Sequence, residues 1–297
     1  MFLTVFTPAY NRAHTLGRTY QSLRQQSCKD FCWLIIDDGS IDNTKNLVES
    51  WLFADDNGFE IKYIYKENGG LHTAYNCAIE NMSSELAVCI DSDDYMPVNA
   101  VQLIKEKWLK DGSYEYAGII GLDYTVGGKL IGSLLPNQKA VNLIDISTGN
   151  CKVSGDKKDV VRVDLYKSVA PMRVYKGEKN FNPHYMHLEI SRNYDFLVLN
   201  KEICIVDYQE DGMTANIFRQ YYNSPNSFLE IRKQYFSFSD RTMKGDIKNM
   251  IHLVSSSLLA RRYLKELYES KHKVLMLLCT APGLLLMLLT IKKGNIR

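Results

Sequence analysis

The chain has 297 residues, enough for one large domain or two small ones, and its 45% hydrophobic and 24% charged residues are ordinary for a protein with a packed core. Its formal net charge of +2 comes without a long basic tract, which argues against nucleic-acid binding by bulk electrostatics. The seven cysteines are scattered singly and are odd in number, so neither a zinc site nor a disulfide framework is predicted.

The first hundred residues alternate between strand-like and helix-like segments. Residues 2–7 form a β-branched and aromatic run that is typical of a first strand and not of a signal peptide, so we expect a cytosolic catalytic part. Further strands are predicted at 32–36, 61–65 and 86–90, and a helical pattern follows each strand. This order indicates βαβ units and therefore an α/β fold, with a mostly parallel sheet flanked by helices.

Polar residues follow each of these four strands. In a parallel sheet the carboxyl ends of the strands share one edge, and ligands bind there. The four strand-end segments are Thr7-Pro8-Ala9-Tyr10-Asn11-Arg12, Asp37-Asp38-Gly39-Ser40, Lys66-Glu67-Asn68-Gly69-Gly70 and Asp91-Ser92-Asp93-Asp94. The sequence therefore predicts a binding site at this edge of the sheet.

Beyond residue 111 the pattern is looser. Strands are predicted at 116–122, 160–165, 196–199 and 204–208, and residues 125–130 form a candidate hairpin around two glycines. From about residue 220 the sequence becomes helical and basic, with an apolar stripe between Ile251 and Leu267. We predict a catalytic domain at 1–219, a helical extension at 220–270 and an apolar, membrane-associating tail at 271–297.

The tail contains the most apolar segment of the chain, residues 274–291. The segment is at the lower limit of length for a membrane span, and Pro282-Gly283 interrupt it. Because basic residues on both sides suit anionic headgroups, we predict a re-entrant or surface-lying hairpin on the inner face of the cell membrane. The alternative is a buried helix, broken at Pro282, that packs on the rest of the protein. The flanking basic residues are Lys271, His272, Lys273, Lys292, Lys293 and Arg297.

Asp91 and Asp93 are separated by one residue on a turn after a buried strand, so both carboxylates can face one cleft. Mg²⁺ or Mn²⁺ needs only one or two protein carboxylates when substrate phosphates complete its coordination. The alternative is a loop of solvated acids in which Asp94 lies near a helix start and suits the helix dipole. The acidic pair by itself does not distinguish these two interpretations.

The other strand-end segments also allow two interpretations. Asp38 can accept a hydrogen bond from a ribose hydroxyl or a base, or the acids of its turn can cap the next helix. Backbone amides beside Gly69 and Gly70 can approach a pyrophosphate, whose charge Arg12 or Lys66 can offset. The sequence contains neither GxxxxGK[ST] nor GxGxxG, which disfavours a P-loop nucleotide triphosphatase and a standard dinucleotide-binding fold.

Taken in order, these segments resemble the family 2 glycosyltransferases. The resemblance rests on residues 5–12, 35–40, 68–76 and 91–94, whose order and spacing are similar to those of the family. It implies a GT-A fold, a nucleotide-diphosphate sugar donor, a Mg²⁺ or Mn²⁺ ion and inversion at the anomeric carbon.

The resemblance also implies roles for individual residues. Asp38 would meet the base, Asp91 would lie beside the ribose or the metal, and Asp93 would be the principal metal ligand. Pro8 and Tyr10 would line the nucleotide pocket. The other predicted donor-binding residues are Thr7, Asn11, Arg12, Lys66, Gly69, Gly70, Asn76 and Ser92.

The second half of such an enzyme supplies a general base for the acceptor hydroxyl. Residues 177–184 resemble a stretch in which many relatives carry a Gly-Glu-Lys-Phe…Pro-Glu pattern; Glu178 matches the first acid, but His184 stands in place of the second. Histidine can act as a base near neutral pH, so we predict His184 and Glu178 jointly as catalytic. If His184 only contacts the acceptor, Glu178 or Glu189 is the alternative base. Residues 208–214 resemble a recurring loop that is expected to close over donor or acceptor.

We therefore predict an inverting glycosyltransferase that moves a sugar from a nucleotide-diphosphate sugar, with UDP the expected nucleotide, to a hydroxyl of a lipid-linked glycan. The apolar tail and the usual role of family members favour bacterial surface-polysaccharide synthesis. One alternative is a nucleotidyltransferase, which would need a glycine-rich basic loop where residues 8–12 stand. The other is a membrane-bound scaffold that kept the GT-A fold without turnover, which His184 in place of an acid leaves open.

Overall fold

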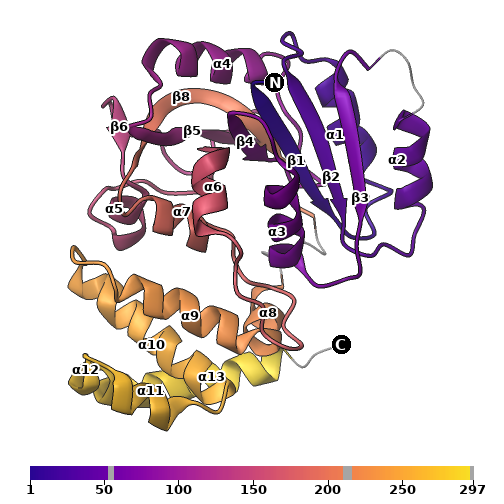
Figure 1. Cartoon of the computed structure of the whole chain (residues 1–297). Coiled ribbons are helices and arrows are strands. Elements are labelled where there is room, and N and C mark those ends of the chain that lie inside the picture. The colour runs from indigo at the N-terminus through magenta and orange to yellow at the C-terminus, as the bar shows by residue number, and fades with distance from the viewer. Residues whose placement is uncertain (53–56, 210–215, 295–297) are drawn as a thin grey trace. The chain divides into compact units, whose positions relative to one another are not determined.

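The chain divides into two compact units, each with its own hydrophobic core. The computed structural model describes residues 1–52, 57–209 and 216–294 (Figure 1). The first unit comprises residues 1–143, 153–172 and 186–208, and the second comprises 144–152, 173–185 and 209–297. The predicted boundaries at 219 and 270 stay predictions.

The first unit is built on one sheet. Its strands within the described residues are β1 (Leu3–Ala9), β2 (Phe31–Asp37), β3 (Glu60–Tyr65), β4 (Leu86–Cys89), β5 (Tyr116–Thr125), β6 (Ala140–Val141), β7 (Lys157–Arg162) and β8 (Asp195–Val206). Their order across the sheet is β3-β2-β1-β4-β7-β5-β8-β6. The first four strands are mutually parallel, β5 and β8 are parallel, and β6 and β7 run antiparallel to their neighbours. The prediction of a mostly parallel sheet is confirmed.

Helices cover the sheet because its central strands are apolar on both faces. In β1 and β2, Val5, Phe6, Trp33 and Ile35 are fully buried, as is usual for parallel strands between helical layers. The flanking helices in Figure 1 are α1 (Leu16–Arg24), α2 (Thr44–Leu52), α3 (Leu71–Asn81), α4 (Ala100–Asp111) and α6 (Val163–Val169). Two further helices, α5 (Leu143–Thr148) and α7 (His184–Ile190), cross the division between the units.

Several predicted elements are shifted in the structure. The strands predicted at 196–199 and 204–208 are one strand, β8, because it pairs along the whole of β5 through irregularities in register. The strand predicted at 160–165 is β7, which lies three residues earlier because its charged first half pairs with β5. The candidate hairpin at 125–130 is a tight turn, with a single bridge between Tyr124 and Leu130.

The second unit contains a group of packed helices. They are α8 (Ile217–Asn223), α9 (Pro225–Tyr235), α10 (Met243–Leu259), α11 (Tyr263–Glu269), α12 (Lys273–Leu278) and α13 (Thr280–Gly294). Their shared core includes Leu229, Met250, Val254 and Met276. The predicted apolar stripe is divided between α10 and α11, since Arg261 adopts a left-handed backbone conformation with φ of 57°.

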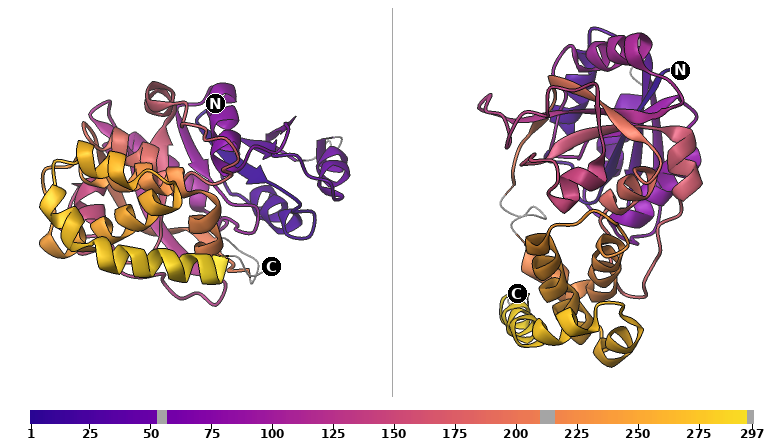
Figure 2. Two further views of the ribbon diagram at one scale, coloured as in Figure 1. Left: turned by 90° about the horizontal axis from the view of Figure 1, so that it is seen from below. Right: turned by 90° about the vertical axis from the view of Figure 1, so that its left-hand side faces the viewer.

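The apolar tail forms α12 and α13, and α13 packs alongside α10 (Figure 2). Gly283 lies so close to Val254 that an added Cβ would come within 2.4 Å of its side chain. Pro282 lies in the first turn of α13, where its missing N–H is tolerated, so the interruption falls at Cys279 and not at Pro282. The tail thus packs on the helical unit, although it is neither wholly buried nor broken at Pro282 as the alternative interpretation expected.

The opposite side of the tail helices is apolar and exposed. None of the described helices is both long and apolar enough to cross a membrane. The exposed apolar residues of α12 and α13 are Val274, Leu277, Leu278, Leu284, Leu285, Leu288 and Leu289.

Candidate active site

The carboxyl ends of β1, β2, β3 and β4 lie at one edge of the sheet, as predicted. Parallel register pairs Ala9 with Asp37 and Asp37 with Tyr65. The pairing continues beyond the strands, because the Asp38 N–H donates to the Ala9 carbonyl over 2.8 Å and the Ile90 N–H donates to the Phe6 carbonyl over 3.0 Å. Three of the predicted polar segments therefore extend directly from paired backbone.

Asp38 organises the glycine segment after β3. Its buried carboxylate accepts hydrogen bonds from the Gly69 N–H over 3.0 Å, the Gly70 N–H over 2.7 Å and the Lys66 Nζ over 2.5 Å. Gly70 has φ of 96°, which favours glycine. Asp38, Lys66, Gly69 and Gly70 are thus brought together, and the carboxylate fixes the shape of the loop.

The loop after β1 is fastened to the loop after β2. Asn11 has φ of 55°, its N–H donates to Ser40 Oγ over 2.8 Å, and its Oδ1 accepts from the Ile41 N–H over 2.9 Å. The Arg12 N–H donates to Thr44 Oγ1 over 3.0 Å. Tyr10 lies between β1 and these anchored residues and is 48% exposed. The hydrogen bonds hold the two loops together, while Tyr10 remains accessible at the sheet edge.

The acidic turn alternates between buried and accessible side chains. Ser92 and Asp94 are buried, whereas Asp91 and Asp93 are partly accessible. Burial and the nearby charge of Asp91 raise the pKa of Asp93, while the Arg12 guanidinium opposes the shift. A hard divalent cation relieves such repulsion between carboxylates, and oxygen atoms are the ligands it prefers. The donor set of Asp91 and Asp93 therefore fits Mg²⁺ or Mn²⁺.

The acidic turn is tied to the end of β8. Tyr95 exchanges two backbone hydrogen bonds with Ile205, at 3.1 and 2.8 Å. The Asp207 N–H donates to Asp94 Oδ1 over 3.3 Å, and Arg18 forms an ion pair with Asp207 at 2.5 Å. The turn is consequently held by chain segments more than a hundred residues apart.

A largely buried lysine, whose side chain is 12% exposed, lies behind the turn. The ammonium of Lys158, on β7, is 3.7 Å from Asp94 Oδ2. Burial raises the pKa of Asp94 to about 7 and that of Asp123 to about 6, although Lys158 opposes both shifts. Burial would lower the pKa of Lys158, but Cys204 and the surrounding carboxylates raise it well above its ordinary value. One internal cation thus compensates the negative charge beneath the turn.

Sequence reasoning missed Lys158 because residues 157–159 are charged and resemble a solvated segment. The insertion of β7 between β4 and β5 is what buries the lysine.

Two predicted donor-binding side chains are engaged inside the protein. Thr7 Oγ1 donates to the Ile90 carbonyl over 2.8 Å and accepts from Trp33 Nε1 over 3.0 Å. The Asn76 amide forms two hydrogen bonds with the backbone of Met172, at 3.0 and 2.8 Å. Thr7 thereby links β1 to the residue before the acidic turn, and Asn76 links α3 to the segment at Met172.

The predicted catalytic carboxylates also have partners. Glu178 is buried and accepts four hydrogen bonds from Asn226 and Ser227, at the start of α9. Glu189 forms a two-point ion pair with Arg192 at 2.8 and 3.1 Å. His184 begins α7, and its Nε2 lies 3.1 Å from Ser147 Oγ. Of these three groups, Glu178 has a clear structural role.

A buried histidine on α7 was not predicted. His187 Nδ1 lies 2.7 Å from Asp159 Oδ2, and its Nε2 lies 2.8 Å from the Tyr166 hydroxyl. Asp159 lies on β7 and Tyr166 on α6, so no local sequence pattern connects them to His187. The sequence signal for His187 was its spacing of three residues from His184. Of the predicted loop at 208–214, residues 210–214 lie outside the described residues, and the Tyr208 ring is exposed.

The segments at the sheet edge are those of a known family. Residues 4–130 match the sequence model of glycosyl transferase family 2. This region belongs to that family. The match includes all four strand-end segments, so the predicted family is confirmed for this region.

The relatives differ in how much of the chain they cover. The GalNAc(5)-diNAcBac-PP-undecaprenol beta-1,3-glucosyltransferase of Campylobacter jejuni is 23% identical over 301 residues, covering 99% of this chain and 94% of the relative. The chondroitin synthase and the hyaluronan synthase of Pasteurella multocida are each 33% identical over 109 residues, which is 37% of this chain. The chain spans only 11% of the length of these two synthases.

Solved structures show the same fold. S. aureus TarS 1-349 in complex with UDP-GlcNAc has a TM-score of 0.62 at 17% identity, covering 97% of this chain and 82% of the TarS 1-349 chain. The mannosyltransferase PcManGT of Pyrobaculum calidifontis, in complex with GDP-Man and Mn²⁺, has a TM-score of 0.55 at 15% identity, covering 99% of this chain and 83% of that protein. The predicted GT-A fold is confirmed.

Proposed function

We propose that the chain transfers a sugar, with inversion, from a nucleotide-diphosphate sugar to a hydroxyl of a lipid-linked glycan in bacterial surface-polysaccharide synthesis. The observation that carries the proposal is the sheet edge, where the acidic turn and the Asp38-bound glycine loop both follow the carboxyl ends of parallel strands. A UDP-sugar is the proposed donor, and the structural similarity to TarS bound to UDP-GlcNAc supports this choice. The C. jejuni relative, named for an undecaprenol-linked acceptor, supports the acceptor class.

In this proposal the strand-end residues hold the donor. Asp93 and Asp91 would hold Mg²⁺ or Mn²⁺, which when bound offsets the charge of the departing diphosphate. Tyr10 offers its exposed ring to the nucleotide, and the guanidinium of Arg12 adds positive charge beside the acidic turn. The Asp38 carboxylate already accepts hydrogen bonds from the glycine loop, so a contact with the base would use the remaining lone pairs of its oxygens.

The proposed chemistry is a single displacement. The acceptor oxygen bonds to the anomeric carbon as the bond from that carbon to the diphosphate oxygen breaks, and the nucleoside diphosphate leaves with the electron pair. The acceptor hydroxyl gives its proton to His184, which we propose as the base because Glu178 is committed to the start of α9. The remaining donor-side residues position the sugar nucleotide.

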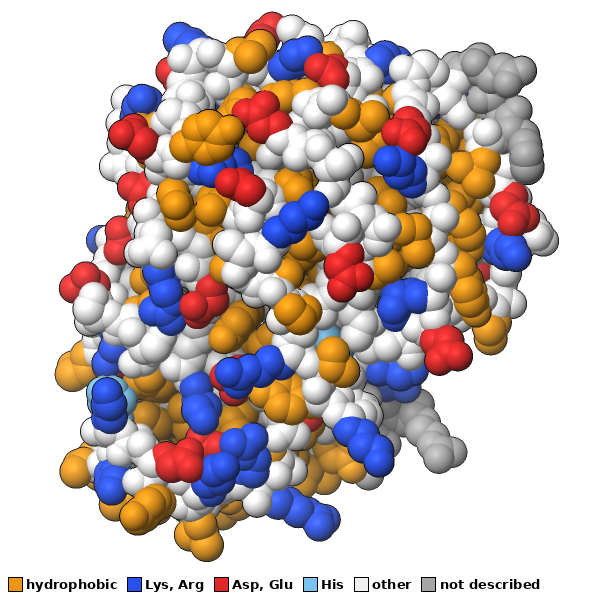
Figure 3. Space-filling model, viewed as in Figure 1, with side chains coloured by type: hydrophobic (Ala, Val, Ile, Leu, Met, Phe, Trp, Pro, Cys, Tyr) orange, Lys and Arg blue, Asp and Glu red, His pale blue; other side chains and the backbone are white. Residues whose placement is uncertain are grey.

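We also propose that the protein binds peripherally to the inner face of the cell membrane. The exposed leucines of α12 and α13 would enter the headgroup boundary, while Lys271, Lys273 and Lys292 would meet anionic lipids. Figure 3 shows apolar and basic side chains together on the surface of the C-terminal helices, at the bottom of that view.

A donor-hydrolysis assay tests the reaction. UDP-glucose, UDP-GlcNAc and GDP-mannose are each incubated with the protein and Mn²⁺, and nucleotide release is measured. We expect release from a UDP-sugar, its loss in Asp93→Ala, and ordinary rates in Glu80→Gln, which changes an exposed acid of α3. Thermal shifts with UDP and Mn²⁺ report binding without turnover. Binding without any hydrolysis or transfer would favour the scaffold, and no nucleotide binding by the wild type would refute the proposal.

Vesicle flotation tests the membrane surface. We expect binding to vesicles containing phosphatidylglycerol and weak binding to neutral vesicles. Changing both Leu285 and Leu288 to Gln should weaken binding by at least about tenfold, because burial of two leucines in lipid is lost. Val126→Gln, an exposed apolar residue of the first unit, is the matched control. Equal flotation of both variants would contradict the proposed surface.

A further inference from the structure

A cavity of about 470 Å³ lies at the opposite edge of the sheet from the acidic turn. Glu85 precedes β4 and Arg162 ends the antiparallel strand β7, so both lie where β4 begins. Asp91 and Asp93 follow the other end of β4. The cavity is therefore separate from the proposed donor site.

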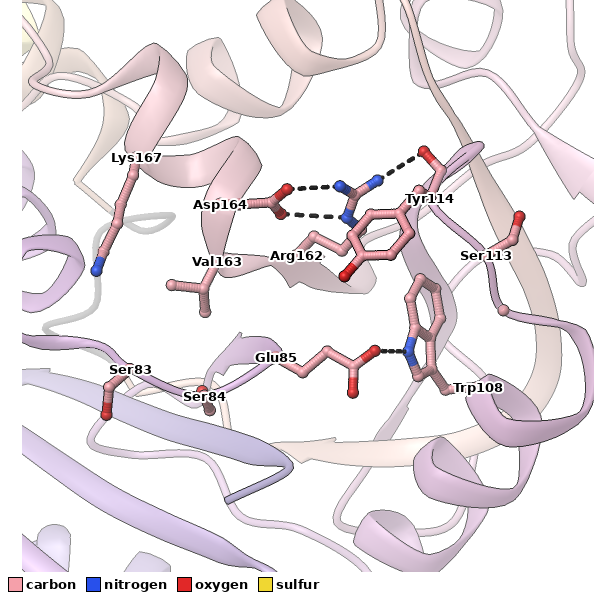
Figure 4. A pocket seen from close by; sticks show the side chains of 11 residues that line it. Ser83, Ser84, Glu85, Trp108, Ser113, Tyr114, Arg162, Val163, Asp164 and Lys167 are labelled. Carbon is pink, nitrogen blue, oxygen red and sulfur yellow. Dashed lines mark hydrogen bonds and ion pairs between the residues drawn. The ribbon is translucent and has the colours of Figure 1, made fainter.

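One wall of the cavity presents a fixed aromatic ring. Arg162 is 5% exposed; its Nε donates to Asp164 Oδ1 over 3.1 Å and its Nη1 donates to the Tyr114 carbonyl over 2.7 Å. The guanidinium carbon lies 4.6 Å from the centre of the Tyr114 ring, and Figure 4 shows the ring lying across the guanidinium. Tyr114 nevertheless remains 83% exposed. The arginine supports one face of the ring and leaves the other accessible.

The facing wall carries a hydrogen-bond acceptor. Glu85 Oε1 accepts from Trp108 Nε1 over 2.6 Å, which orients the carboxylate, as Figure 4 shows. Within the part of the chain that the structure describes, the Oε2 atom of Glu85 makes no hydrogen bond. Ser83 and Ser113 add hydroxyl groups at the margins. An oriented carboxylate and an exposed ring thus border the same space.

The charges around the cavity balance. Glu85 and Asp164 are acidic, Arg162 and Lys167 are basic, and the lysine donates to the Met82 carbonyl over 2.8 Å. A phosphorylated ligand would meet two carboxylates, and a purely apolar ligand would desolvate charged groups without compensation. A neutral ligand with many hydroxyl groups and one apolar ring face suits all of these surroundings.

We propose that this cavity binds a neutral sugar unit of a glycan, with an apolar face of the sugar against Tyr114 and its hydroxyls on Glu85. The site would hold saccharide away from the reaction centre. The proposal does not depend on the transfer reaction, because none of its residues belongs to the donor edge.

Ligand-observed NMR with the full chain tests the proposal, using methyl β-glucoside and methyl N-acetyl-β-glucosaminide as probes. We expect saturation transfer to at least one probe, and the same transfer in Asp93→Ala, which disables only the donor edge. Tyr114→Ala should weaken binding by about three- to tenfold, as expected for loss of one stacking surface. Glu85→Gln should weaken it too, since an amide replaces the charged acceptor.

Tyr114→Phe is the matched control, because it keeps the ring and should keep binding. Tyr114 and Glu85 are both exposed, so changing them should not prevent folding, and circular dichroism verifies the folding of every variant. The proposal is overturned if neither probe binds, if Tyr114→Ala binds as the wild type does, or if Asp93→Ala abolishes binding. The last result would assign the saccharide to the donor edge instead.

Discussion

Glu178 should prove to be a stabilising residue and not the catalytic base. Its carboxylate accepts from the N–H groups of Asn226 and Ser227, both at 2.8 Å, and from their side chains at 2.8 and 2.6 Å. These N–H groups belong to the first turn of α9, where a helix has no internal acceptors for them. In Glu178→Ala, the loss of a helix cap costs about 1 kcal/mol and the loss of a charge at the positive end of the helix about 1 kcal/mol more.

Buried donors left without an acceptor add about 1 to 2 kcal/mol, so we expect the free energy of unfolding of Glu178→Ala to fall by about 3 to 4 kcal/mol. Urea denaturation followed by circular dichroism measures the loss. Glu178→Gln keeps one carbonyl acceptor and should lose about half as much. Donor hydrolysis is measured below the unfolding transition, where kcat of both variants should stay within about threefold of the wild type. A Glu178→Gln protein of ordinary stability whose kcat is about a hundredfold lower would refute the reasoning and make Glu178 catalytic.

Three further changes address the sheet edge. Asp38→Asn should lower the free energy of unfolding by about 1 to 3 kcal/mol in urea denaturation, because the glycine loop loses a charged acceptor. For the same reason it should weaken UDP binding in titration calorimetry. Unchanged UDP binding would show that the glycine loop does not contribute to the donor site. The folded-state pKa of Asp123, about 6, exceeds its ordinary value of about 3.9. The protonated carboxyl therefore makes its full contribution to the free energy of unfolding below pH 4, and this contribution is lost as the pH rises through 6. Asp123→Asn should therefore be more stable than the wild type by about 3 kcal/mol at about pH 8 and nearly equal to it near pH 4. A gain that is independent of pH would contradict this origin. Gly39→Ala should lower the melting temperature, since φ is 82° and a Cβ would lie 2.7 Å from the Asn68 backbone nitrogen. Gly17→Ala should raise the melting temperature, because Gly17 has open space around it and alanine favours the helix. The reverse order of the two melting temperatures would contradict the geometry.

The sheet and its functional edge could be predicted because their signals are local. Each early strand is a short apolar run followed by a polar turn, and the parallel arrangement brings the turns together. Asp38 illustrates the limit of this reasoning, because its position at the edge was predicted while its hydrogen bonds to Gly69 and Gly70 were not. A carboxylate that binds a ligand and one that binds a neighbouring loop look the same in sequence.

The supporting charges could not be predicted because they depend on contacts between distant segments. Lys158 is buried only because β7 enters the sheet between β4 and β5 in the antiparallel direction. The contact of Glu178 with Ser227 joins residues 49 positions apart, and neither residue's neighbours indicate it. Burial of a polar group is therefore decided by topology, which local periodicity does not specify.

The place of β7 in the sheet has a consequence for how this chain can be divided. Residues 4–130 carry the family's sequence signature, but β7 and β8 come from beyond that region and supply the neighbours of β4 and β5. A fragment that ends at residue 130 would leave β5 without either of its neighbouring strands, leave one edge of β4 unpaired and leave Asp94 without Lys158. The part of the chain that identifies the family is thus shorter than the part that must fold together, and a truncated protein intended to isolate the signature would contain its residues without the framework that positions them.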